Sequence, residues 1–186
     1  PHNFYVNSLF VFIGFSLFIY YFLTKKIKIS KNENLLLLSV ALILIIFTLG
    51  FKTHDDFNYY HFPYTYYLTQ QKIIIGIGEL NHGFRTHSSI FYFNSMFYLP
   101  FIKYYSLNFG ALYIWTFANI VLLKKFYPLF INQKLKFNIN YEIYLSLLVF
   151  IFINIFFYRV SEHGTDRSAQ ILIFILFIEL LCIFNL

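Results

Sequence analysis

The chain has 186 residues, of which 59% are hydrophobic, 24% aromatic and only 12% charged, and its formal net charge is +6. A soluble domain carries roughly 25% charged residues, so this composition excludes an ordinary soluble protein, and the abundance of Phe, Tyr, Ile and Leu excludes a disordered chain. The sequence predicts a single membrane domain over residues 1–186. Because it begins with Pro1 and stops at Leu186 inside an apolar run, we expect it to be a fragment of a longer protein.

Five apolar stretches have about the length of a helix that crosses a bilayer core of roughly 30 Å. Several are slightly short, and tyrosines near their ends can extend them as anchors at the level of the lipid headgroups. The expected fold class is therefore all-α, a polytopic transmembrane helix bundle with about five visible spans. The expected spans are residues 6–23, 35–51, 107–123, 143–158 and 169–186.

Lysines predict which way these helices point. The connection after the first stretch contains four lysines, and so does the connection after the third. The positive-inside rule places both connections in the cytoplasm, so residues 52–106 and 159–168 face outward. The basic residues are divided between short loops instead of forming one footprint, so nucleic acid is not an expected partner.

Acidic residues and histidines are concentrated in the two outward loops. These loops hold five of the eight carboxylates and five of the six histidines, in the company of many Phe, Tyr and Ile residues. This mixture predicts a folded layer at the membrane interface, although any solvated loop also collects charge.

The first outward loop, residues 52–106, contains an acidic pair and a glycine pair. Asp55 and Asp56 follow a predicted span, where partial burial can adapt a carboxylate to proton transfer or cation binding. The aromatic pattern of residues 58–71 predicts one or two short interfacial helices, with a break at Pro63. Gly76 and Gly78 permit a tight backbone passage or the close approach of a ligand, but a lone Gly-x-Gly step does not indicate a dinucleotide site.

Residues 88–102 of the same loop are apolar enough to enter the membrane. Asn94 and Pro100 interrupt them, and a full span here would turn Lys124 and Lys125 outward against the charge rule. We therefore favour an interfacial or re-entrant helix over a transmembrane one.

A divalent cation is a possible cofactor, and no other is indicated. Asp55, Asp56 and His61 offer oxygen and nitrogen ligands that suit Mg²⁺ or Mn²⁺, but their spacing matches no established metal site. The sequence also lacks GxSxG, P-loop and Cys/His nucleophile patterns.

The second outward loop, residues 159–168, is short and polar. Asp166 lies near the start of the last predicted helix, where a carboxylate also interacts favourably with the helix N-terminus, so helix capping and a site role both remain open.

These loop residues together resemble a known family. The order of an acidic pair, a Tyr-His step, a Gly-x-Gly-x-x-Asn step, a nearby Arg and a later loop ending in an acidic residue is similar to the outer-face signature of bacterial polytopic proteins of uncharacterised function related to the GT-C glycosyltransferases. The resemblance covers residues 52–170, although the family usually places its acidic pair after the first helix and here it follows the second. The residues that carry it are Asp55, Asp56, Tyr60, His61, Gly76, Gly78, Asn81, Arg85, Ser88, Ser89 and Asp166.

The resemblance implies an enzyme of the bacterial inner membrane. It would take a sugar from a polyprenyl-phosphate donor and pass it to a glycan or lipid acceptor on the extracytoplasmic face. The resemblance gives Asp55 or Asp56 the role of base or metal ligand, and Glu162 or Asp166 that of the second acidic position.

Elementary chemistry agrees with such a reaction. A carboxylate can take the proton of an attacking hydroxyl, and the departing phosphate needs a cation, for which Arg85, Lys72 and Arg159 are candidates. The alternative hypothesis is a membrane transporter or flippase-like protein for lipid-linked glycans. Transporters place ionisable residues deep inside their spans, whereas here Glu179 is the one carboxylate so placed.

Overall fold

The computed structural model describes residues 3–24, 34–36, 38–42, 55–72, 74–85, 88–127, 141–157 and 165–184. Every regular element in these ranges is helical, which confirms the all-α class. The α-helices are α1 (Phe4–Thr24), α3 (Phe62–Gln70), α4 (Ser89–Ser95), α5 (Phe109–Phe126), α7 (Tyr141–Phe156) and α8 (Thr165–Phe184). The shorter elements are a π-helix, η1 (Phe57–His61), and three 3₁₀ turns, η2 (Ile77–Glu79), η3 (His82–Arg85) and η4 (Tyr104–Ser106).

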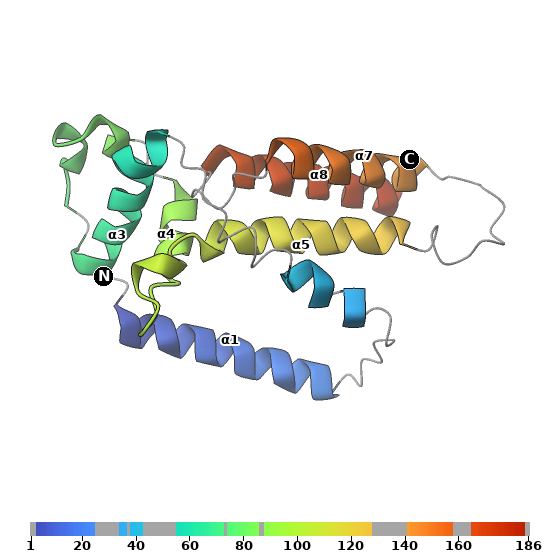
Figure 1. Ribbon diagram of the computed structural model, residues 1–186, viewed down its shortest axis with the longest axis horizontal. Coiled ribbons are helices and arrows are strands. Elements are labelled where there is room, and N and C mark those ends of the chain that lie inside the picture. Colours follow the sequence, from blue (N-terminus) through green and yellow to red (C-terminus); the bar gives the residue numbers. More distant parts are fainter. Residues whose placement is uncertain are drawn as a thin grey trace.

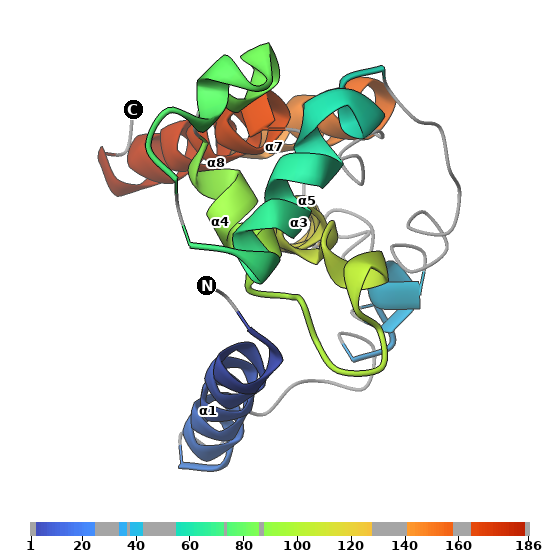
Figure 2. The ribbon, with the colours of Figure 1, turned by 90° about the vertical axis from the view of Figure 1, so that its left-hand side faces the viewer.

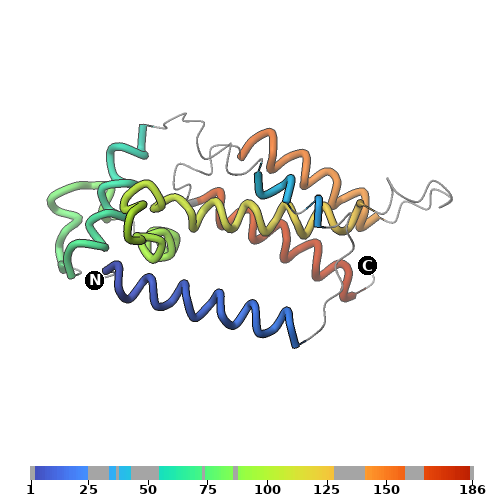
Figure 3. The backbone as a smooth tube through the Cα atoms, turned by 60° about the horizontal axis from the view of Figure 1, so that its bottom comes forward, coloured from blue at the N-terminus to red at the C-terminus, as the bar shows by residue number. Residues whose placement is uncertain are grey.

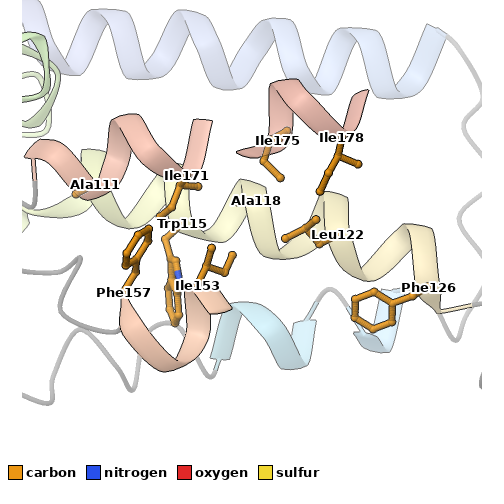
Figure 4. Packing of buried hydrophobic residues seen from close by; sticks show 10 residues of the cluster. All are labelled: Ala111, Trp115, Ala118, Leu122, Phe126, Ile153, Phe157, Ile171, Ile175 and Ile178. Carbon is orange, nitrogen blue, oxygen red and sulfur yellow. The ribbon is translucent and has the colours of Figure 1, made fainter. Parts of the chain in front are cut away.

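Helices α5, α7 and α8 form the core. Helix α5 packs against both of the others, and α7 runs antiparallel to it (Figure 1). Its buried residues recur every three or four positions, the spacing that places them on one face, and the small side chains of Ala111 and Ala118 allow close approach. Figure 4 shows them against buried residues of the partner helices: Ile153 and Phe157 from the α7 segment, and Ile171, Ile175 and Ile178 from α8.

Three helical segments are long and apolar enough to cross a membrane. They are Phe4–Thr24, Tyr104–Phe126 and Asp166–Phe184, which lie close to three of the five expected spans. Helix α7 is apolar but has only 16 residues. Of the expected second span, residues 35–36 and 38–42 are helical, and the rest lies outside the described residues. The count of five spans is therefore not confirmed.

Helix α1 is joined to the other elements mainly through its first turn. Within this helix, all of whose residues are described, Asn7 is the one buried residue. The Nδ2 group of Asn7 donates hydrogen bonds to the carbonyl oxygens of Ser95 (2.9 Å) and Tyr98 (3.1 Å), and the ring of Phe4 stacks on that of Tyr98 at 5.0 Å. The remainder of α1 stands apart from the bundle in all three views (Figures 1, 2 and 3). Its apolar side chains are exposed around the whole circumference, as suits a helix in lipid.

Residues 55–106 cover one end of the bundle, and we call their described part the cap (Figure 1). The N-terminus of the chain and the first turns of α5 and α8 lie at this same end. Helix α4 has seven residues, which amounts to about 10 Å of helix and is too short to cross a bilayer. The structure thus excludes a continuous span over residues 88–102, in agreement with the interpretation that we favoured.

At the opposite end of the bundle, one lysine joins three helices. The Nζ atom of Lys125 lies 2.9 Å from Oε1 of Glu142, 3.1 Å from Oε1 of Glu179 and 3.0 Å from Sγ of Cys182. Nearer the middle of the bundle, Nδ2 of Asn154 donates to Oδ1 of Asn119 at 2.7 Å. Glu179, which the sequence placed alone inside a span, therefore has a cationic partner.

Candidate functional site

The cap begins with one continuous helix that contains a π turn. Residues 55–56 are helical, the π-helix η1 follows, and α3 continues to Gln70, with Pro63 in its first turn. Proline has no N–H group, so the carbonyl of Tyr59 lacks the donor that an α-helix would provide four residues later. The side-chain amide of Asn81 donates to this carbonyl at 3.3 Å. The break expected at Pro63 is therefore a local widening of the helix. The Tyr59 carbonyl there binds Asn81 and so attaches the loop of residues 74–85.

The residues of η1 place two predicted site residues side by side. The rings of Tyr60 and His61 lie 4.3 Å apart in an edge-on arrangement, and His61 is 5.5 Å from the ring of Phe91 in α4. His61 is only 8% exposed, and Phe91 is fully buried beside Tyr64. Helix α4 thus packs against the Tyr-His step through Phe91, which positions both side chains.

The loop of residues 74–85 lies against this step through Asn81 and Gly83. Oδ1 of Asn81 accepts a hydrogen bond from the backbone N–H of Gly83 at 2.9 Å, which forms a tight turn. A Cβ atom added at Gly83 would lie 2.4 Å from both Cβ and Cγ of Tyr60, so only glycine fits against that ring. Gly83 is not among the site residues predicted from the sequence. The Asn-x-Gly step in which it stands is the signal that could have indicated it.

The paired glycines shape the far side of the same loop. Gly76 has a φ of +87°, in the left-handed region that favours glycine, and it introduces η2. A Cβ atom at Gly78 would meet Cγ of Arg85 at 2.6 Å. Nε of Arg85 donates to the carbonyl of Gly78 at 3.1 Å, and its NH2 group lies 3.3 Å from Oε1 of Glu79. Both glycines therefore serve the passage of the backbone, and Arg85 closes the loop with Glu79, which is not among the predicted site residues.

The Tyr60 phenol is under the electrostatic influence of two carboxylates, Asp56 from its own helix and Asp166 from α8. Burial raises the pKa of Tyr60, and the negative charges of Asp56 and Asp166 raise it further. Asp56 precedes Tyr60 by four residues, which places the two on one side of the helix, whereas Asp55 is exposed. Asp166 stands in the first turn of α8, which begins at the end of the bundle that the cap covers (Figure 1).

Four of the predicted site residues are linked: the rings of Tyr60 and His61 are in contact, and the charges of Asp56 and Asp166 act on the Tyr60 phenol, while Asn81 holds the adjoining loop. We call these four the Tyr60 cluster. The first-turn position of Asp166 also suits a favourable interaction with the α8 N-terminus, so its two expected roles are compatible.

Other predictions for the site are not supported by a grouping of side chains. Glu162 and Arg159 lie outside the described residues, as does His54. Among the residues that the structure describes, no three His, Cys, Asp or Glu side chains are grouped so as to hold a metal ion. The possible Mg²⁺ or Mn²⁺ site at Asp55, Asp56 and His61 is thus not assembled by these residues alone.

Comparisons of the chain with protein-family models, with curated proteins and with solved structures gave no match. The relation to the GT-C glycosyltransferases therefore stays a hypothesis that depends on the order of residues in the two polar loops.

Proposed function

We propose that the chain belongs to a GT-C-like membrane glycosyltransferase that takes a sugar from a polyprenyl-phosphate donor. The observation that carries this proposal is the Tyr60 cluster, in which the charges of two carboxylates, one from the cap and one from α8, act on one phenol at the end of a bundle with helices of membrane-spanning length. A lipid-linked donor presents its phosphate and sugar at such a membrane boundary. The proposed site faces the extracytoplasmic side of the bacterial inner membrane, as the lysine distribution predicts.

In the proposed reaction, Asp56 acts as the general base. Its carboxylate takes the proton from an acceptor hydroxyl while the hydroxyl oxygen forms a bond with the anomeric carbon of the sugar, and the bond from that carbon to the phosphate oxygen breaks. Tyr60 keeps its proton, because burial and the two carboxylates oppose its ionisation, so it can donate a hydrogen bond to a sugar or phosphate oxygen. Asp166 is the second acidic group of the site.

The departing polyprenyl phosphate carries negative charge and needs a cationic partner. Arg85 and Lys72 are the described candidates, and Arg159 is a third that lies outside the described residues. Arginine suits the role best because its planar fork binds two phosphate oxygens at once. In the structure the Arg85 guanidinium is half exposed and bound to Glu79, so binding a phosphate would require it to exchange that partner.

The distribution of charge offers less support to the transporter hypothesis. Among described carboxylates, Glu179 is the one located well within a membrane-length helix, and it is paired with Lys125 at the end opposite the cap. A translocation path normally places ionisable groups near the bilayer midplane.

Sugar transfer by the full-length protein in liposomes that contain a polyprenyl-phosphate sugar tests the proposal. We expect Asp56→Asn to lower the rate by about 100-fold or more, the usual contribution of a general base, and Asp166→Asn to lower it as well. Asn58→Ala, an exposed change on the same helix, should leave the rate unchanged. Asp55→Asn should leave the rate unchanged if Asp56 is the base, and a loss of transfer in this variant alone would assign the role to Asp55. Unaltered transfer by the Asp56→Asn and Asp166→Asn variants, singly and combined, would show that the cluster is not catalytic.

Labelling with an impermeant thiol reagent tests the proposed orientation. In a Cys182→Ser background, a cysteine at the fully exposed position 75 in the cap should react from outside the cell, and one at the exposed position 124 should not. The reverse pattern would place the cap in the cytoplasm.

A further inference from the structure

The chain makes a narrow hairpin between α4 and α5, and we call its residues 99–103 the tip. The backbone N–H of Lys103 donates to the carbonyl of Leu99 at 2.8 Å, which closes the hairpin. The side chain of Phe101 is 100% exposed, and Ile102 beside it is also exposed. Phe101 and Lys103 have φ values of +72° and +52°, so both are held in a backbone conformation that non-glycine residues rarely adopt.

The base of this hairpin is firmly held. The Ser106 hydroxyl lies within hydrogen-bond distance of the carbonyl oxygens of both Phe97 and Lys103. The carbonyl of Tyr98 accepts the hydrogen bond from Asn7, and the ring of Tyr98 stacks on Phe4. The tip is therefore fixed both to the start of α5 and to the first turn of α1, and its outward position is imposed by the fold.

These attachments also place the tip at the boundary of the membrane. Two of the three membrane-length segments, Phe4–Thr24 and Tyr104–Phe126, begin beside it. Figure 1 shows the loop between α4 and α5 extending to the place where α1 begins. Rings and lysines at the ends of transmembrane helices lie at the level of the lipid headgroups. The tip adds a fully exposed phenylalanine to a region where Tyr104 and Tyr105 are exposed as well.

We propose that the tip inserts into the lipid leaflet on the cap side of the membrane. Phe101 and Ile102 enter the upper part of the acyl chains, and the Lys103 ammonium meets the lipid phosphates. Lipid is the partner that suits these residues, because burial in hydrocarbon stabilises exposed apolar side chains and because a rigid, strained hairpin presents them in water to nothing else in the described structure. The tip thereby fixes the height of the cap above the bilayer, independently of the reaction that the Tyr60 cluster performs.

A second exposed apolar residue provides a matched control. Ile75 is also 100% exposed, but it belongs to the loop of residues 74–85, which is joined to the helix of residues 55–70 through Asn81. The contacts that join the tip to the starts of Phe4–Thr24 and Tyr104–Phe126 do not involve this loop, so its exposure to water is expected to persist in the presence of lipid.

The test uses the full-length Cys182→Ser protein in liposomes of neutral and anionic phospholipids, with a fluorophore attached at Phe101→Cys, at Ile102→Cys or at Ile75→Cys. Because all three positions are exposed, these changes remove little packing. Lipids with brominated acyl chains should quench the label at 101 by about half and the label at 102 to a similar degree, since an interfacial segment inserts only about 5–10 Å. The label at 75 should be unaffected. Absence of quenching at both 101 and 102 would overturn the proposal, and so would equal quenching at 75, because the whole cap would then lie flat on the bilayer.

Discussion

Replacement of Gly83 by alanine tests whether the loop of residues 74–85 positions Tyr60. The added methyl group would lie 2.4 Å from both Cβ and Cγ of Tyr60, atoms next to the backbone that cannot swing aside as the end of a long side chain can. The backbone at Gly83 has no positive φ, so alanine is not opposed by its own conformation. The cost is therefore steric and falls on the contact with Tyr60.

We expect Gly83→Ala to lower the free energy of unfolding by about 2 kcal/mol, in the middle of the range for overpacking. For a chain of this size that corresponds to a melting temperature lower by roughly 4–8 °C. The displaced Tyr60 should also reduce sugar transfer if the proposed function is right.

Thermal unfolding of the full-length protein in one detergent, followed by tryptophan fluorescence, measures this effect. Gly14→Ala is the matched control, because a Cβ atom at Gly14 would meet nothing within 4 Å and alanine favours the interior of a helix by about 0.5–1 kcal/mol. We expect this control to melt at the same or a slightly higher temperature. A Gly83→Ala protein that is as stable as wild type would refute the close contact between the loop and Tyr60.

Three further changes probe the bundle and the electrostatics of the cluster. Lys125→Met leaves the carboxylates of Glu142 and Glu179 without their cation and should cost about 1–3 kcal/mol of unfolding free energy. Neutralising both carboxylates in the Lys125→Met protein should restore most of this loss. Equal stability of the Lys125→Met protein and the protein with all three changes would argue against the network. Asn154→Leu removes the 2.7 Å hydrogen bond to Asn119 and should cost about 1 kcal/mol, measured by the same melting assay, with no loss expected if that bond does not form in lipid. Tyr60→Phe should flatten the alkaline side of the stability profile. Because folding raises the pKa of Tyr60, the contribution of this phenol to the free energy of unfolding is fully present below pH 10 and is lost as the pH rises further. Above pH 10 the variant should therefore lose less stability than wild type. Equal slopes of the two stability profiles would show that the phenol is not buried.

Local sequence features predicted the helical segments well. The expected spans 6–23, 107–123, 143–158 and 169–186 lie within a few residues of α1, α5, α7 and α8, and the interfacial helices expected over residues 58–71 correspond to η1 and α3. Apolar length is a local property, because a helix satisfies its own backbone and the surrounding lipid selects for continuous hydrophobicity. Asn94 and Pro100 likewise predicted an interruption, and the only α-helix within residues 88–102, all of which the structure describes, is the seven-residue α4.

The choice among candidate site residues depended on contacts that no local pattern contains. Asp55 and Asp56 are equivalent as letters in the sequence, but in the structure Asp55 is exposed and the charge of Asp56 acts on Tyr60. Arg85 was expected near a phosphate, whereas in the structure it is bound by Glu79 and the carbonyl of Gly78. Spacing along the chain shows which groups can share a helix face, but it does not show which loop will lie across that face.

The sequence by itself indicated helices long and apolar enough to cross a membrane, where those helices run, and that five of the eight carboxylates fall in two polar segments. Those properties follow from composition and from the length of apolar runs, each of which acts on a residue and its near neighbours. Only the tertiary structure decided that the charge of Asp166 acts on Tyr60, that Gly83 fits against the same ring and that Lys125 binds carboxylates of two other helices. Such pairings depend on how helices distant in sequence pack and on the register between them, which the apolar pattern of each helix leaves open.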